Sequence, residues 1–290
     1  MRIGQLLRSD KLLSELSTFG IGGPARYFLE AKTILDVQEA FIWAQSQNIR
    51  VFIVGKGSNS LFDDRGFNGL VIQNRIDFCE FTSNQVHVGA GYSFSHLGVQ
   101  TARKGFSGLE FASGIPGTVG GAIFMNAGAN GGQTFDPLQE VLFFDGQKME
   151  QKLFTKEDLT FAYRTSLFQQ LSGCILSARF ALKSNPEARK FQLSIVDYRL
   201  KTQPYKDKSV GCIFKNPSEK VSAGALIDRC SFKGSFVGKA AVSPMHANFI
   251  INRGGALASE VEELIALVQN RVFEQTGVHL ETEVRKVAYE

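Results

Sequence analysis

Hydrophobic and polar positions recur along this chain with two different periods, one typical of helices and one typical of strands. Over residues 34–47, apolar side chains recur at three- and four-residue spacing from Val37 to Ala44, which predicts a helix with one buried side. The run 51–54 that follows is short and continuously apolar, so it predicts a buried strand. This alternation predicts a fold in which helices and strands are mixed along the chain.

The same reasoning extends to the rest of the chain. Further strands are predicted at 69–72, 86–90, 212–214, 247–251 and 280–287, and further helices at 93–104, 188–201 and 259–276. Gly105 and Gly277 follow two of these helices, where a residue with positive φ commonly ends a helix. In the last predicted strand Glu281, Glu283 and Arg285 would share one face, because side chains alternate along a strand.

Turn signals divide the chain into regions. The sequence Ser-Asn-Pro-Glu at 184–187 interrupts the periodic pattern, and Gln203-Pro204 follows the next predicted helix. We therefore expect a first region over 1–187, made of two lobes that split near residue 72, and a C-terminal domain over 188–290. A chain of 290 residues is long enough for two or three such lobes.

The composition indicates a soluble globular protein. Hydrophobic residues make up 43% of the chain and charged residues 21%, and no apolar run reaches the roughly 18 to 20 residues that span a bilayer. The first residues lack the pattern of a secretion signal, so we expect a cytoplasmic protein with no membrane insertion. The net charge of +4 comes from scattered basic residues, which favours anionic small molecules over nucleic acid as partners.

Four cysteines are widely separated along the chain. Cys79, Cys174, Cys212 and Cys230 form no CxxC pair and have no flanking histidine at metal-ligand spacing, so neither a metal site nor a structural disulfide is predicted. Cys212 stands in the stretch 209–217, Ser-Val-Gly-Cys-Ile-Phe-Lys-Asn-Pro. Two interpretations of Cys212 remain, a small buried side chain and a group that gives up a proton.

Two glycine-rich stretches are candidates for ligand binding. Residues 108–132 are the richer in glycine, and backbone without side chains lets N–H groups approach a pyrophosphate or a flat ring. Tight turns between packed strands explain the same composition equally well. The stretch 55–60, Gly-Lys-Gly-Ser-Asn-Ser, lacks the third glycine of the GxGxxG fingerprint, and the chain contains no P-loop.

Seven motifs in chain order together carry a family resemblance. They are TFGIGGP at 18–24, VGKGSN at 54–59, GLEF followed by GIPGTVGGAIFMNAG within 108–128, AYRTS at 162–166, GCIFKNP at 211–217, HANF at 246–249 and EVR at 283–285. This set resembles the UDP-N-acetylenolpyruvoylglucosamine reductases, and it runs from about residue 18 to residue 287. The resemblance is specific, because all seven motifs agree in order.

The resemblance implies an α+β protein with an FAD-binding fold of the vanillyl-alcohol-oxidase (PCMH) type and a smaller C-terminal α+β substrate-binding domain. FAD would be bound non-covalently, and the last strand 280–287 would return to the N-terminal lobe. The residues implied to hold FAD are Gly55, Lys56, Gly57, Ser58, Asn59 and Ser60 near the pyrophosphate, and Gly114, Ile115, Pro116, Gly117, Thr118, Gly120, Gly121 and Ala122 along the cofactor.

The reaction implied is the reduction of UDP-N-acetyl-3-O-(1-carboxyvinyl)glucosamine to UDP-N-acetylmuramate, a peptidoglycan precursor, with NADPH as the hydride donor to FAD. Hydride addition leaves negative charge beside the substrate carboxylate, which must be stabilised and then quenched by a proton. Arg164 matches the family's catalytic arginine and Glu283 its catalytic glutamate. Cys212 stands where most members have a proton-donating serine, and a thiol is the stronger acid.

The same resemblance implies that Tyr163, Lys215, Asn216 and His246 contact the UDP-sugar, with Lys215 neutralising diphosphate charge. The residues alone also fit a solvated lysine and a hydrogen-bonded structural histidine. The short spacing after Arg164 places the chain in the subclass that lacks a tyrosine-bearing loop, and we expect a monomer. Two other functions stay open, an FAD-dependent oxidase of another sugar or alcohol and a non-catalytic nucleotide-sugar-binding module.

Overall fold

The computed structural model describes residues 3–290, and its contacts divide the chain into two compact units. Unit 1 consists of the residues up to Arg8, Phe28–Gly55 and Gly69–Arg199, and unit 2 consists of Ser9–Tyr27, Lys56–Asn68 and Leu200–Glu290. Each unit therefore draws on both of the predicted ranges, 1–187 and 188–290. The assignment of FAD binding and UDP-sugar binding to those two ranges stays a prediction.

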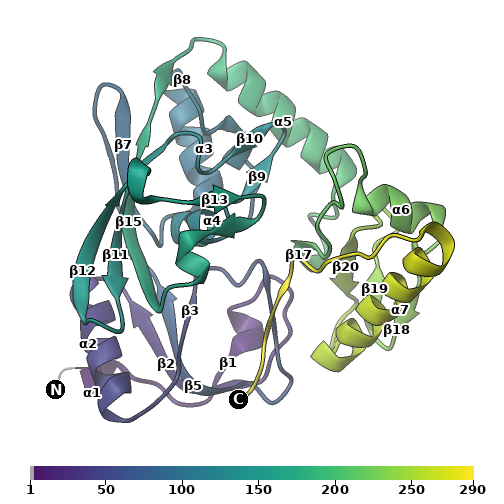
Figure 1. Cartoon of the computed structure of the whole chain (residues 1–290), viewed down its shortest axis with the longest axis horizontal. Helices are drawn as coiled ribbons and strands as arrows, with labels where there is room; N and C mark the ends of the chain where they lie inside the picture. The colour runs from purple at the N-terminus through teal and green to yellow at the C-terminus, as the bar shows by residue number, and fades with distance from the viewer. Residues whose placement is uncertain (1–2) are drawn as a thin grey trace. The chain divides into compact units, whose positions relative to one another are not determined.

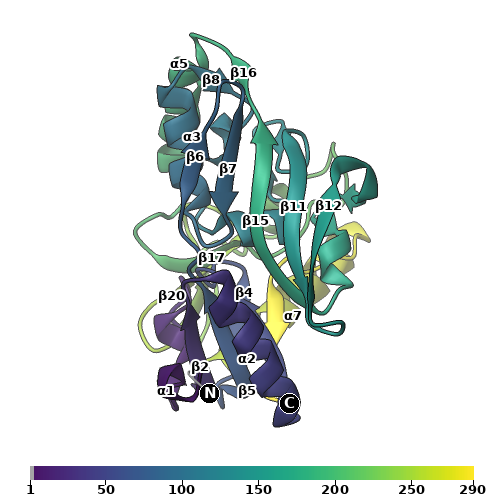
Figure 2. The ribbon, with the colours of Figure 1, turned by 90° about the vertical axis from the view of Figure 1, so that its left-hand side faces the viewer.

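A five-stranded antiparallel sheet in the order β12-β11-β15-β7-β6 forms the middle of unit 1, and Figure 2 shows these strands side by side. Its strands are β6 (Cys79–Phe81), β7 (Gln85–Gly89), β11 (Leu138–Asp145), β12 (Glu150–Thr155) and β15 (Gly173–Ala181). Val141, Ala178 and Val88 are register partners across three strands, so they present one apolar face. Phe94 and Ile123, from α3 (Phe94–Arg103) and α4 (Val119–Phe124), join the same buried cluster.

Further helices and strands complete unit 1. They are α1 (Ile3–Leu6), α2 (Ile34–Ser46), β3 (Val51–Val54), β8 (Phe106–Ser107), η2 (Glu110–Ala112), β9 (Gly128–Ala129), β10 (Gly132–Gln133), η3 (Lys156–Asp158), β13 (Phe161–Ala162), β14 (Thr165–Ser166), η4 (Leu167–Gln169) and β16 (Lys183–Ser184). Three elements contain residues of both units: β2 (Pro24–Ala31), β5 (Phe67–Asn74) and α5 (Ala188–Thr202).

Most predicted elements of unit 1 are confirmed. The helix predicted at 34–47 is α2, which begins at a capping box in which Thr33 Oγ1 accepts from Asp36 N (3.1 Å) and Asp36 Oδ2 accepts from Thr33 N (2.9 Å). The strand predicted at 51–54 is β3, and it pairs in parallel with β5. No strand was predicted over β11 or β12, because register shifts interrupt the alternation of β11 and nearly all of β12 is exposed.

Unit 2 is built on a four-stranded antiparallel sheet in the order β17-β20-β19-β18, which lies beside α7 in Figure 1. Its elements are β1 (Lys11–Leu12), η1 (Leu13–Glu15), β4 (Ser60–Phe62), β17 (Lys208–Cys212), α6 (Ala223–Arg229), β18 (Phe236–Val237), β19 (Ala240–Val242), β20 (Phe249–Asn252), α7 (Ala258–Thr276) and β21 (Arg285–Val287). The helix predicted at 259–276 is α7, which ends at Gly277 with φ of 70°. One side of α7 is buried in the core of unit 2, through Val261, Leu264, Ile265, Val268 and Val272.

Two strand predictions near the C-terminus are wrong in their bounds. The strand predicted at 212–214 begins where β17 ends, and only Arg285–Val287 of the predicted strand 280–287 is a strand, β21. The chain bends at Val284 and changes partner there, because Glu283 N donates to Ile213 O (2.7 Å) and Arg285 N donates to Asn59 O (3.0 Å). Glu281, Glu283 and Arg285 therefore do not share the face of one continuous strand. β21 itself pairs in parallel with β4, from the first quarter of the chain.

Within residues 3–290, none of the helices is both long enough and apolar enough to cross a membrane.

The carboxylate of Asp64 caps the N-terminus of α7. Its Oδ1 accepts from Ala258 N (2.6 Å) and its Oδ2 accepts from Ser259 N (3.2 Å), while the N-cap position itself is Leu257, whose side chain has no acceptor. We expect Asp64→Ala to lower the free energy of unfolding by about 1 kcal/mol, measured by urea denaturation. Asp64→Asn keeps one acceptor oxygen and should lose less. Equal stability of Asp64→Ala and the native chain would contradict this.

Candidate active site

Gly55 and Thr118, from the two glycine-rich stretches of the sequence, meet within unit 1. A β-carbon built at Gly55 would overlap Thr118 Oγ1 and lie 3.0 Å from Thr118 Cγ2. Thr118 is also the N-cap residue of α4, where its Oγ1 accepts from Gly121 N at 3.3 Å. The residue after β3 therefore packs directly against the side chain of the N-cap residue of α4. Both are stretches that the sequence analysis predicts to hold FAD.

The remaining residues of the 114–122 stretch fall into two groups. Gly114 N donates to Ser95 Oγ (2.8 Å) and Gly120 N donates to Ala90 O (2.8 Å), so these N–H groups hold the loop in place. A β-carbon at Gly120 would lie 3.0 Å from that of Ala90, which explains this glycine by packing of α4 on β7. Gly121, by contrast, is exposed. A β-carbon built there would meet only Thr118 Oγ1 within 4 Å, at 3.5 Å, among the described residues beyond its own neighbours in the helix.

One hydroxyl in this stretch was missed by the sequence analysis. Ser113 is fully buried, and its Oγ has no hydrogen-bond partner within the described part of the chain. A buried hydroxyl without a partner is costly, and a ligand acceptor nearby would relieve that cost. Together with the exposed, bare backbone at Gly121, this arrangement fits a bound flavin nucleotide. The only sequence signal for Ser113 is its place directly before Gly114.

Residues 56–60 continue the first stretch into unit 2. Gly57 has φ of 57°, and a β-carbon there would lie 2.6 Å from Leu16 O, so glycine is required at this turn. Asn59 Nδ2 donates to Glu283 O (3.1 Å), and Ser60 is the register partner of Arg285. The structure therefore joins this predicted cofactor loop to the backbone of a predicted catalytic residue.

Cys212 is the last residue of β17 and is half-buried. The register between β17 and β20 shifts between Ser209 and Cys212, and Gly211 within this bulge has φ of 80°. A bulge with a glycine in the left-handed region turns the residues that follow it relative to the sheet. Gly211 thus permits the bulge after which the ladder resumes at Cys212, which pairs with Phe249.

The structure brings Cys212 and Glu283 onto adjacent segments of unit 2. Glu283 N donates to Ile213 O at 2.7 Å, and Ile213 directly follows Cys212. Glu283 is half-buried at the point where the chain passes from Ile213 to the β4 pairing. A backbone hydrogen bond therefore joins Glu283 to the residue after Cys212, so two of the three predicted catalytic residues lie on adjacent segments.

Arg164, the third predicted catalytic residue, belongs to unit 1 and occupies the tip of the hairpin between β13 and β14. Its backbone has φ of 57°, which a non-glycine residue rarely adopts. Its Nη2 donates to Gly128 O (3.1 Å), and its guanidinium lies 4.8 Å from the ring centroid of Tyr163. Both the strained backbone and the carbonyl contact restrict the guanidinium to few orientations.

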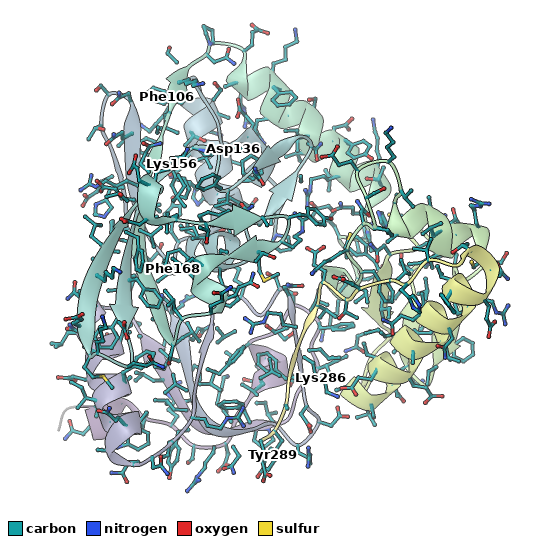
Figure 3. All side chains as sticks on the ribbon, viewed as in Figure 1. Phe106, Asp136, Lys156, Phe168, Lys286 and Tyr289 are labelled. Atoms are coloured by element: carbon teal, nitrogen blue, oxygen red, sulfur yellow. The ribbon has the colours of Figure 1, made fainter. Side chains whose placement is uncertain are left out.

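Gln169 holds the Arg164 backbone and was missed by the sequence analysis. Its Nε2 donates to Arg164 O (3.0 Å) and to Phe124 O (2.8 Å), at the end of α4. Next to it in η4, Phe168 is buried against Phe143, with ring centroids 5.4 Å apart; Figure 3 labels Phe168. The sequence gives only a weak signal for Gln169, because an amide that follows two apolar residues has many possible hydrogen-bond partners.

The predicted substrate residues lie in different surroundings. Tyr163 is exposed on the hairpin of unit 1, and Asn216 is exposed in unit 2, where its Oδ1 accepts from Ala223 N (3.1 Å). Lys215 Nζ forms an ion pair with Glu281 Oε2 at 3.1 Å. His246 Nδ1 accepts from Asn248 N (3.2 Å), and burial, together with the charge of Lys233, lowers the pKa of His246.

Two protein-family models match the chain. One, described as FAD binding domain, matches residues 25–147, and the other, described as UDP-N-acetylenolpyruvoylglucosamine reductase, C-terminal domain, matches residues 203–287. A UDP-N-acetylenolpyruvoylglucosamine reductase of Protochlamydia amoebophila is 57% identical over 293 residues, which cover 100% of this chain and 97% of the relative. The enzyme of the same name from Chlamydia muridarum is 47% identical, covering 96% and 93%.

A solved structure agrees with these matches. The crystal structure of UDP-N-acetylenolpyruvylglucosamine reductase from Thermus caldophilus superimposes with a TM-score of 0.82 at 36% identity, covering 97% of this chain and 99% of the other. With the FAD binding domain match, this confirms the predicted α+β class and FAD-binding fold.

Replacement of Gly55 tests its approach to Thr118. We expect Gly55→Ala to purify with less flavin, measured as flavin absorbance relative to protein absorbance, because the added methyl group displaces Thr118. Gly55→Ala combined with Thr118→Ala should regain part of the flavin. Gly4→Ala is the matched control, since a β-carbon at Gly4 meets nothing within 4 Å. A full flavin content in Gly55→Ala would contradict the interpretation.

The neutral ring of His246 makes stability depend on pH. Its pKa is lower in the folded protein than the ordinary 6.5, so the unfolded chain binds this proton more readily. The free energy of unfolding should therefore decrease as pH falls below the ordinary value of 6.5, until the ring is protonated in the folded protein as well. His246→Asn keeps an acceptor for Asn248 N but does not titrate. Urea unfolding should show a smaller decrease for this variant, and an unchanged decrease would contradict the assignment.

Proposed function

This chain belongs to the UDP-N-acetylenolpyruvoylglucosamine reductase family, and we propose that Arg164, Cys212 and Glu283 carry its reaction. The enzyme reduces UDP-N-acetyl-3-O-(1-carboxyvinyl)glucosamine to UDP-N-acetylmuramate for peptidoglycan synthesis, with FAD and NADPH. The observation that supports the residue assignment best is the hydrogen bond from Glu283 N to Ile213 O, next to Cys212. The hydrogen bond from Asn59 to Glu283 O also brings the predicted cofactor loop next to Glu283.

When bound, FAD supplies the hydride, taken from NADPH, that adds to the terminal carbon of the substrate's enolpyruvyl group. The bare backbone at Gly121 would admit the cofactor, the packing of Gly55 on Thr118 would hold the two stretches together, and Ser113 would gain a partner. Lys56, Ser58 and the remaining residues of both stretches would complete its binding site. The residues of this chain then have two tasks, which are to stabilise the charge that forms on the substrate and to deliver a proton.

Arg164 would bind the substrate carboxylate. A guanidinium donates two parallel hydrogen bonds to a carboxylate, which stabilises the negative charge as it spreads from the neighbouring carbon. The contacts with Gly128 and Gln169 fix the backbone and one guanidinium nitrogen before substrate arrives. Such preorganisation avoids reordering a flexible side chain during the reaction.

Cys212 would donate the proton. As hydride adds to the terminal carbon, the π electrons of the double bond move to the adjacent carbon, and the S–H bond of Cys212 supplies the proton that forms its new C–H bond. The sulfur is left as a thiolate, which takes a new proton from water. Glu283, half-buried and held to Ile213, would assist as a hydrogen-bond donor in its protonated form.

Lys215 and Asn216 would contact the UDP-sugar, with Lys215 exchanging Glu281 for a phosphate oxygen. Tyr163 would pack against the substrate beside Arg164, and His246 would contact it as a neutral ring. We also propose that the enzyme acts in the cytoplasm, where NADPH and nucleotide sugars are made, and that it acts as a monomer.

Replacement of Cys212 separates the two half-reactions. We expect Cys212→Ala to reduce FAD with NADPH at a rate within about twofold of the native enzyme, while oxidation of the reduced flavin by the UDP-sugar falls by roughly 100-fold or more. Cys212→Ser should keep part of the second rate, since a hydroxyl also carries a proton. Anaerobic stopped-flow absorbance of the flavin measures both rates.

Cys230→Ala is the control, because Cys230 is buried in the core of the same unit and has no proposed role. Native turnover in Cys212→Ala would remove Cys212 from the mechanism. Consumption of NADPH without any dependence on the enolpyruvyl UDP-sugar would instead favour an oxidase acting on another substrate.

A further inference from the structure

The side chain of Asn248 takes the place of a strand partner beside the segment that follows Cys212. Asn248 Nδ2 donates to Phe214 O (2.8 Å), and Asn248 Oδ1 accepts from Phe214 N (2.9 Å). The backbone carbonyl of Asn248 also accepts from Ile213 N at 2.9 Å. Asn248 is 3% exposed, so these bonds are shielded from water.

This arrangement begins where the regular ladder ends. β17 and β20 pair at Ser209 with Ile251 and, after the bulge at Gly211, at Cys212 with Phe249. No further ladder pair of these two strands follows in the described chain, and the amide of Asn248 continues the pattern by offering one donor and one acceptor. An aliphatic side chain at position 248 could do neither.

The opposite side of the same segment is held by the C-terminal segment. Ile213 O accepts from Glu283 N at 2.7 Å, and Lys215 N donates to Glu281 O at 2.8 Å. Ile213 and Phe214 are therefore fixed from both sides, by Asn248 and by the backbone that carries Glu283. A shift away from Asn248 would change the distance between Cys212 and the substrate carbon, and the position of Glu283 with it.

We propose that Asn248 is a positioning residue that sets the geometry of proton delivery by Cys212, an inference that rests on the proposed role of Cys212. Without the amide, the buried N–H and C=O groups of Phe214 lose their partners, and the segment moves to regain hydrogen bonds. Proton transfer depends steeply on the distance between donor and acceptor atoms, so a small shift slows it. Reduction of the flavin by NADPH needs no proton from Cys212 and is unaffected.

Asn248→Ala tests this in the FAD-loaded enzyme by anaerobic stopped-flow, with NADPH saturating. We expect flavin reduction within about twofold of the native rate, and flavin oxidation by the enolpyruvyl UDP-sugar slowed by roughly tenfold or more. Native rates in both half-reactions would overturn the proposal. Equal slowing of both half-reactions would also overturn it, because it would show a general loss of structure.

Asn252→Ala is the matched control. Asn252 is a buried amide at the other end of β20, where its Nδ2 donates to Phe19 O (2.9 Å) and its Oδ1 accepts from Ala256 N (3.0 Å). It makes a comparable set of bonds and none to residues 212–216. Its loss should destabilise the protein to a similar extent without separating the two half-reactions, and the same separation in this variant would overturn the specific role of Asn248.

Asn248→Asp covers the case in which Asn248→Ala does not fold. A protonated aspartic acid can donate to Phe214 O and accept from Phe214 N, as the amide does, whereas the carboxylate cannot donate. Burial raises the pKa of such a carboxyl group. The oxidation rate of this variant, divided by the native rate at the same pH, should therefore rise as pH falls, and a flat ratio would contradict the proposal. The Cys212→Ala variant tests the role of Cys212 by itself. Failure of the proposed role of Cys212 and failure of the proposed role of Asn248 therefore give different results.

Discussion

The hydrogen bond from the Glu283 N–H group to the carbonyl of Ile213, 2.7 Å long, is the interaction on which the proposed site of unit 2 depends. It places the backbone of the proposed carboxyl group beside the residue that follows the proposed proton donor. Cys212 is the last ladder residue of β17, and Glu283 lies outside regular sheet because β21 begins only at Arg285. The C-terminal segment exchanges one partner for another at this point, and that exchange leaves Glu283 on irregular backbone, where binding residues are common.

Side-chain amides supply the partners that irregular backbone lacks. Buried N–H and C=O groups outside a ladder still require hydrogen bonds, and an amide carries both a donor and an acceptor. In unit 2, the Asn248 amide donates to Phe214 O and the Asn59 amide donates to Glu283 O. In unit 1, the Gln169 amide donates to Arg164 O. In unit 2 the amides of Asn59 and Asn248 come from segments distant in the sequence, whereas in unit 1 Gln169 follows Arg164 by five residues. In each case a side-chain amide holds backbone that has no strand partner there.

The sequence predicted the long regular elements well and the irregular ones poorly. The helices α2 and α7 followed from periodicity, because each buries one continuous face, and β3 followed from its apolar run, although only Val54 of that run is buried and the other three residues are half-buried. The range 280–287 was wrong as a single strand, since alternation of side chains carries no information about a change of partner at Val284. Ser113 was missed because its feature is a hydrogen bond that it lacks, and Gln169 because its feature is the two carbonyl groups that it binds; no local pattern of residues records either.

The sequence by itself determined the family, the cofactor class and the residue types available for chemistry, because motifs such as GIPGTVGG and GCIFKNP require particular side chains or their absence at fixed spacing. Only the tertiary structure decided which glycine is close-packed, which hydroxyl is buried without a partner, and that Cys212 lies next to Glu283, 71 positions later in the chain. The reason is physical. Backbone hydrogen bonds between distant segments depend on where the whole chain runs, and a local stretch of residues does not specify its distant partner.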